Sequence, residues 1–145
     1  METALRIINC EPQFSSVLKN KLLKKGFTLE QITSVLEQLK ELELLDDSRL
    51  ARIYAGDLMR IKLYGSMIVR AKLYEKGVER NVAEEAVMRA LEDNGGEVEL
   101  CRKCLEKKID SQLDTKTKIR RLASKGFSMG TIRNVLKNAD EYFSE

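Results

Sequence analysis

Apolar side chains recur every three or four residues along almost the whole chain, which is the spacing of one face of an α-helix. Ile32, Val35, Leu36 and Leu39 are a typical set. No segment alternates apolar and polar residues in the manner of a half-buried strand, so the pattern predicts an all-α protein. The expected helices cover residues 4–10, 14–25, 29–43, 49–63, 67–76, 81–91, 98–109, 115–125 and, after Ser128, the last stretch, where Tyr142 and Phe143 are expected to pack the tail against the fold.

One segment of the chain occurs three times, at residues 17–27, 68–78 and 117–127. Each copy is a basic helix that ends in Lys-Gly followed by Phe or Val, and the glycines are 51 and 49 residues apart. Such a period is typical of an array of helical units, in which neighbouring units contact one another because a single unit has a small core. We therefore expect three tandem three-helix repeats. The expected repeats cover residues 1–47, 48–96 and 97–145.

Helix ends can also be predicted from the sequence. Thr28 followed three residues later by Gln31 predicts a capping box. Residues 46–48, Asp-Asp-Ser, predict a turn and an N-cap. We expect Ser15 or Ser16 to cap the first basic helix. Glycine after each basic helix suits the position just past a helix end, where a positive φ is needed.

The composition argues against an enzyme. The 145 residues are 43% hydrophobic and 34% charged and contain no histidine, the usual base near neutral pH and the commonest metal ligand. Cys10, Cys101 and Cys104 are expected to be reduced thiols that hold no metal, since a four-ligand site would need carboxylates. No phosphate-binding glycine motif occurs, so no cofactor is expected. No run of 18 apolar residues predicts a membrane span, and the N-terminus does not look like a signal peptide.

Charge is segregated along the chain although the net charge is only +3. The basic segments 14–28, 65–78 and 114–126 carry +4, +2 and +4. The segments 29–43 and 79–93 that follow the first two carry −3 each. A segregated field of this kind steers a charged partner.

Each basic segment contains two bases four residues apart, on one helix face, where like charges cost a few tenths of a kcal/mol. A polyanion or an acidic protein surface would offset this cost in all three copies. The alternative is structural, because a base in the last helical turn interacts favourably with the helix dipole. That explains Lys25 and its counterparts better than Lys21 and its counterparts. The candidate binding residues are Lys21, Lys24, Lys25, Arg70, Lys72, Lys76, Arg120, Arg121 and Lys125.

Residues 22–35, LLKKGFTLEQITSV, followed by residues 42–51, LELLDDSRLA, resemble the first repeat of the RecX family of regulatory proteins. Tyr64-Gly65 with Arg70, Leu73 and Lys76-Gly77-Val78 is similar to the second repeat, and 118–127 to the third. The resemblance extends from about residue 4 to residue 138. In the second repeat, Ala83 and Ala86 replace the bulkier Ile32 and Val35, which indicates closer helix packing or a weaker local core.

The resemblance implies an elongated, curved array and a non-enzymatic, cytoplasmic regulator of the RecA recombinase, acting in DNA repair and recombination. Such proteins bind RecA or its filament on DNA and usually inhibit strand exchange and ATP hydrolysis, and some DNA contact is attributed to them. We expect a monomer. Two alternatives remain open at this point: a helical DNA-binding protein that acts without RecA, and a helical scaffold for another protein.

Overall fold

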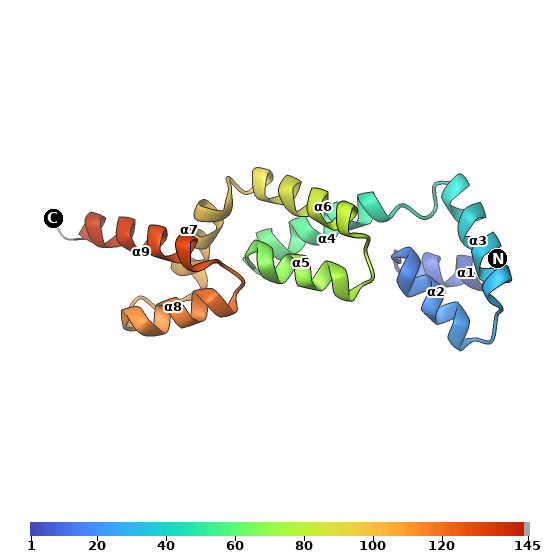
Figure 1. The fold of residues 1–145 in the computed structure, drawn as a ribbon, viewed down its shortest axis with the longest axis horizontal. Coiled ribbons are helices and arrows are strands. Elements are labelled where there is room, and N and C mark those ends of the chain that lie inside the picture. The colour runs from blue at the N-terminus through green and yellow to red at the C-terminus, as the bar shows by residue number, and fades with distance from the viewer. Residues whose placement is uncertain (144–145) are drawn as a thin grey trace.

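The computed structural model describes the backbone of residues 1–143 and the side chains of residues 1–138; Tyr142 and Phe143, expected to pack the tail, thus lie outside the described side chains. The described chain contains nine α-helices and no strand, so the predicted all-α fold is confirmed (Figure 1). None of these helices has the length and apolar character that crossing a bilayer requires. The helices are α1 (Glu2–Cys10), α2 (Ser15–Lys24), α3 (Leu29–Glu41), α4 (Asp47–Arg60), α5 (Ser66–Glu75), α6 (Arg80–Asp93), α7 (Glu97–Lys108), α8 (Thr115–Ser124) and α9 (Met129–Phe143).

The helices form an elongated array of helical repeats (Figure 1). Going along the chain, α1 to α3 lie at one end of the long axis, α4 to α6 in the middle and α7 to α9 at the other end. In each group the middle helix is one of the three basic segments, namely α2, α5 and α8. The array therefore presents the same basic helix three times along its length.

The apolar core is divided into two clusters. The smaller cluster includes Leu18, Leu22, Ile32 and Leu39 and belongs to α1 to α3 and the linker that follows. The larger cluster runs without a break through α4 to α9 and includes Phe14 from the start of α2. The second and third repeats therefore share one core, and Phe14 connects the first repeat to it.

Small side chains line the contact between α4 and α6. Ala51 and Ala55 of α4 and Ala83 and Ala86 of α6 are fully or almost fully buried. The distance between packed helices depends on the side chains at the contact, and alanine permits close approach. The alanines of α6 therefore indicate closer helix packing and not a weaker local core.

The three basic helices lie end to end, in the order α8, α5, α2 (Figure 1). At what we call the second junction, the backbone N–H groups of Gly65 and Met67 donate to the carbonyl oxygens of Lys125 (2.7 Å) and Gly126 (3.2 Å). A Cβ on Gly126 would lie 2.7 Å from the backbone nitrogen of Ile68. The N-terminus of α5 is thus seated directly on the turn that ends α8.

The first junction repeats this arrangement between α2 and α5. A Cβ on Gly77, in the turn after α5, would lie 2.6 Å from the Cβ of Ser16 at the start of α2. Helix dipoles placed in this order bring a positive N-terminus against a negative C-terminus, which is favourable. Gly77 and Gly126 also have φ values of +75° and +99°. Each of the two glycines therefore supplies both a left-handed backbone and room for the next helix.

The first residue of the next group of helices, Asp47 of α4 or Glu97 of α7, supplies a carboxylate that caps the start of α2 or of α5. Asp47 accepts hydrogen bonds from the backbone N–H (2.9 Å) and the hydroxyl of Ser15. Glu97 accepts from the backbone N–H (3.2 Å) and the hydroxyl (3.0 Å) of Ser66. The expectation that Ser15 or Ser16 caps α2 is wrong, because the N-cap residue is Phe14, which has no polar side chain. The missing acceptor comes from 32 residues further along the chain.

The caps that depend on nearby residues are confirmed. Thr28 and Gln31 form the expected capping box, with bonds of 3.0 and 3.2 Å. Asp46 caps α4 by accepting from the Arg49 N–H. Ser128 accepts from the Thr131 N–H at 3.3 Å at the start of α9.

Candidate binding surface

Six of the nine candidate bases occupy two equivalent positions in the basic helices. Lys21, Lys72 and Arg121 are each the seventh residue of their helix, and we call them the inner bases. The residues that directly follow the three helices are Lys25, Lys76 and Lys125, which we call the outer bases. Because α8, α5 and α2 lie end to end, each of these two positions occurs once in every basic helix along the molecule. We call the six the basic row.

The second junction brings bases from two repeats to one aromatic ring. The Nζ atoms of Lys72 and Lys125 lie 5.7 and 5.4 Å from the centroid of the half-buried Tyr64 ring. Cations at this distance from an aromatic face are attracted by its quadrupole. The ring therefore holds an inner base of one repeat beside an outer base of the next, and concentrates positive charge at the junction.

Gln13 occupies the position at the first junction that corresponds to Tyr64, two residues before the first serine of the helix. Its buried side-chain oxygen accepts a 2.9 Å hydrogen bond from the Nζ of Lys21. Lys21 and Lys72, the inner bases at the two junctions, are thus each oriented by the residue that precedes the N-cap of their own helix. Arg121, in the third basic helix, is exposed.

The other three candidates differ from the basic row. Lys24 and Arg120 are exposed. Arg70 is turned toward α6, where its Nε lies 2.6 Å from a carboxylate oxygen of Glu84. That hydrogen bond, with a second from the Tyr74 hydroxyl, holds the pKa of Glu84 below its ordinary value. The charge of Arg70 is therefore largely offset within the protein, unlike the charges of the exposed Lys24 and Arg120.

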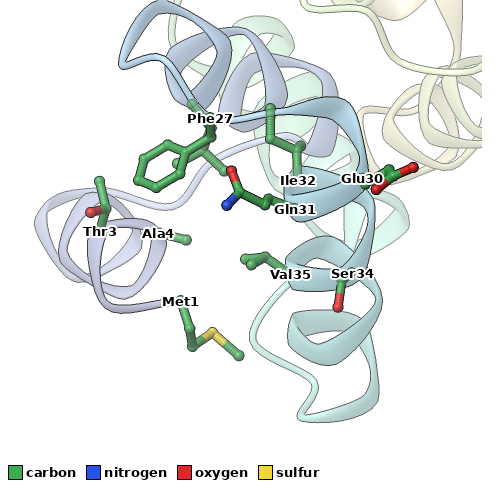
Figure 2. Close-up of a pocket in the computed structure, with 10 residues that line it drawn as sticks. Met1, Thr3, Ala4, Phe27, Glu30, Gln31, Ile32, Ser34 and Val35 are labelled. Carbon is green, nitrogen blue, oxygen red and sulfur yellow. The ribbon is translucent and has the colours of Figure 1, made fainter.

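A pocket of about 440 Å³ lies at the far end of the first repeat (Figure 2). Its apolar wall is formed by Met1, which directly precedes α1, Ala4 of α1, Val35 of α3 and Phe27, which follows the turn at the end of α2. Phe27 is half-buried, whereas the equivalent Phe127 is buried against Gly65 at the second junction. The pocket beside Phe27 is therefore open, whereas the equivalent surface beside Phe127 is covered at the second junction.

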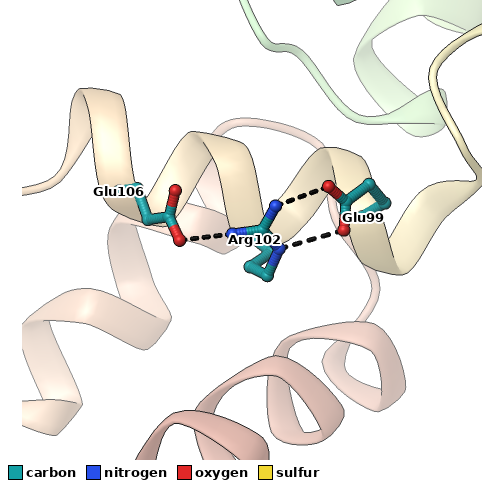
Figure 3. Close-up of polar contacts among 3 residues, drawn as sticks. All are labelled: Glu99, Arg102 and Glu106. Atoms are coloured by element: carbon teal, nitrogen blue, oxygen red, sulfur yellow. Dashed lines mark hydrogen bonds and ion pairs between the residues drawn. The ribbon is translucent and has the colours of Figure 1, made fainter.

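Exposed ion pairs occupy one side of α7. Arg102 binds Glu99 at 2.5 Å and also pairs with Glu106, four residues further along the helix (Figure 3). The guanidinium of Arg102 lowers the pKa of Glu99. Pairs of this kind contribute little to stability because water screens them. Arg102 is already paired, so we do not count it among the candidate bases.

The described residues contain no group of three Cys, Asp or Glu side chains suited to a metal ion. Cys101 and Cys104 are buried in the larger core cluster, and burial raises the pKa of the Cys101 thiol to about 12. A thiol that stays protonated is a poor nucleophile and a poor ligand. Both cysteines therefore act as small apolar core residues.

Sequence reasoning missed the residues that organise the junctions. Tyr64 and Gln13 differ in chemistry, so no shared motif indicated that they occupy the same place. Asp47 and Glu97 offered a usable signal, because each is the first residue of its helix and they are 50 residues apart, close to the repeat period.

Comparison with known proteins gives a consistent result. A family model described as "RecX, second three-helix domain" matches residues 46–87. Regulatory protein RecX of Chlorobaculum tepidum is 36% identical over 143 residues, covering 94% of this chain and 86% of that protein. Regulatory protein RecX of Thermotoga maritima is 32% identical over 138 residues, covering 94% and 82%.

Solved structures show the same fold. The crystal structure of RecX from Lactobacillus salivarius superposes with a TM-score of 0.83 at 23% identity, covering 96% of this chain and 93% of that chain. A second crystal structure of a regulatory protein RecX has a TM-score of 0.79 at 21% identity, covering 94% and 69%.

Proposed function

Because the chain belongs to the RecX family of regulatory proteins, we propose that it regulates the RecA recombinase in the cytoplasm. It binds RecA or the RecA filament on DNA and lowers the recombination and ATPase activities of RecA during DNA repair. It does so by occupying a surface and catalyses no reaction itself.

The observation that supports this proposal is the basic row. Its six bases recur with the helices α8, α5 and α2 along an elongated molecule. A partner that fits it carries negative charge at repeated positions, as a filament of identical subunits or a phosphate backbone does.

The inner bases are the more informative half of the row. An outer base follows its helix directly, where a positive charge is favourable without any partner. An inner base lies within the last turns and gains less from the helix end. We therefore assign binding chiefly to Lys21, Lys72 and Arg121, with the outer bases next.

The test is a charge reversal of the inner bases, Lys21→Glu, Lys72→Glu and Arg121→Glu in one protein, measured as inhibition of DNA-dependent ATP hydrolysis by RecA. The expected result is a loss of inhibition of at least about tenfold in the concentration needed, because three favourable charge contacts become repulsive. The matched control is Lys40→Glu, Lys62→Glu and Lys107→Glu. These three exposed bases lie outside the row, one per repeat, and their reversal changes the net charge equally.

Two results would count against the proposal. Equal loss of inhibition in both triple variants would mean that net charge, not the basic row, matters. Binding to naked DNA as tight as binding to RecA–DNA at equal salt, with RecA ATPase unaffected, would favour a DNA-binding protein that acts without RecA. Contacts with DNA phosphates would also appear as a salt slope reduced by about three in the reversed variant.

A further inference from the structure

Three kinds of residue recur at the ends of the helices in all three repeats. The first residue of α1, α4 and α7 is acidic, and the first residue of α2, α5 and α8 has a hydroxyl. A glycine with positive φ follows each basic helix. The three sets are Glu2, Asp47 and Glu97; Ser15, Ser66 and Thr115; and Gly26, Gly77 and Gly126.

Two of each set meet in the junctions already described. The acids Asp47 and Glu97 accept hydrogen bonds from Ser15 and Ser66. The turn glycines Gly77 and Gly126 lie against the start of the preceding basic helix. The same connection is thus made twice, from each repeat to the next.

One acid, one hydroxyl and one glycine remain, and they lie at opposite ends of the molecule (Figure 1). Thr115 at the start of α8 is exposed at one end, and Glu2 and Gly26 are exposed at the other. A Cβ on Gly26 would meet no described atom within 4 Å. The pocket beside it leaves Phe27 half-uncovered, where Gly65 covers Phe127. The start of α8, where Asp114 caps the Thr117 N–H locally, and the surface at Gly26 and Phe27 therefore correspond to the two halves of a junction.

We infer that a second copy of this chain completes this junction, so that copies associate head to tail. Glu2 of one copy accepts hydrogen bonds from the backbone N–H and hydroxyl of Thr115 of another. The start of α8 of that second copy lies against Gly26 and Phe27 of the first. The contact joins two different surfaces at opposite ends of an elongated molecule, so it generates an open chain of copies.

The association is weak and depends on concentration. Within the chain, covalent linkage holds the halves of a junction at high effective concentration, and this advantage is lost between copies. The net charge of +3 also opposes stacking, although salt of physiological strength screens it. In place of the monomer expected from the sequence, the geometry points to a monomer in equilibrium with short chains. This inference does not depend on the proposed function.

Disulfide trapping in a Cys10→Ser background tests the register of the contact. The double variant Glu2→Cys, Thr115→Cys is expected to form a ladder of dimers, trimers and longer species under mild oxidation. A mixture of the two single variants is expected to form dimers that contain one of each. The geometric control is Ser15→Cys, Asp47→Cys, which pairs the equivalent positions within one chain and forms an intramolecular disulfide.

Sedimentation of the untagged protein tests the association without cross-links. The average mass of the native protein rises with concentration, and Glu2→Lys requires a concentration at least about tenfold higher for the same rise, because the acceptor of two hydrogen bonds is lost. The control Glu92→Lys makes the same charge change on the exposed face of α6. Its average mass should rise with concentration as that of the native protein does, apart from the effect of the changed net charge. The inference is wrong if the native protein sediments as a monomer at every concentration. It is also wrong if the double-cysteine variant stays monomeric while the control cross-links, or if either single variant pairs with itself.

Discussion

Replacing Gly126 with alanine should destabilise the protein much more than replacing Gly26, although the two glycines have nearly the same backbone. Their φ values are +99° and +93°. Alanine in this region is strained by about 1–2 kcal/mol in either case. At Gly26 the new methyl group meets no described atom within 4 Å, so strain is the whole cost.

At Gly126 the methyl group has no room. It would lie 2.5 Å from a side-chain carbon and 2.7 Å from the backbone nitrogen of Ile68, and α5 must move away from the end of α8. Overpacking of this kind costs about 1–3 kcal/mol. The movement also stretches the bonds from Gly65 and Met67 to the carbonyls of Lys125 and Gly126, each worth about 1 kcal/mol. The expected difference between the two variants is therefore about 2–4 kcal/mol.

Urea unfolding followed by far-ultraviolet circular dichroism measures this difference, with the free energy of unfolding obtained by linear extrapolation. The m-value should stay the same in both variants, because the same surface is exposed on unfolding. If the two substitutions cost the same to within about 0.5 kcal/mol, which is the usual scatter of such comparisons, the end-to-end contact of α8 and α5 is not a packed junction.

Two further predictions concern the junction caps and the thiols. Glu97→Ala should lower the free energy of unfolding by about 1–2 kcal/mol, because Ser66 loses the carboxylate that caps α5. The control Glu92→Ala, on the surface of α6, should change the free energy of unfolding by less than about 0.5 kcal/mol. If urea unfolding gives equal effects for the two variants, the cap has no role in stability. Cys10 is exposed and Cys101 and Cys104 are buried, so a thiol reagent at pH 8 should modify one cysteine of the native chain and three of the unfolded chain. The raised pKa of Cys101, about 12 against an ordinary 9.0, favours the folded state below pH 9, and this contribution is lost as the pH rises toward 12.

Features that depend on neighbouring residues could be predicted from the sequence. The capping box at Thr28 and the left-handed glycines after the basic helices each need only a few adjacent residues. The helices themselves followed from the spacing of apolar residues, with ends that differ by a few residues.

Features that depend on distant residues could not be predicted. The sequence alone predicts that the serines of α2 cap that helix, but the acceptor is Asp47, the first residue of α4. The convergence of Lys72 and Lys125 on Tyr64 follows from the end-to-end order of α8 and α5, which the sequence does not indicate. The sequence does not distinguish Arg70 from the other bases, because its pairing with Glu84 depends on how α5 packs against α6.

The division of the apolar core has a consequence for how the molecule opens. Because α4 to α9 share one cluster, the second and third repeats should unfold as one cooperative unit. The first repeat has its own smaller cluster and is connected to the rest through Phe14, the contact of Ser16 with Gly77 and the bonds between Ser15 and Asp47. In a repeat array, opening begins where the interface between neighbours is weakest. Amide hydrogens of α1 to α3 should therefore exchange with solvent through a partial opening that leaves the rest of the protein folded.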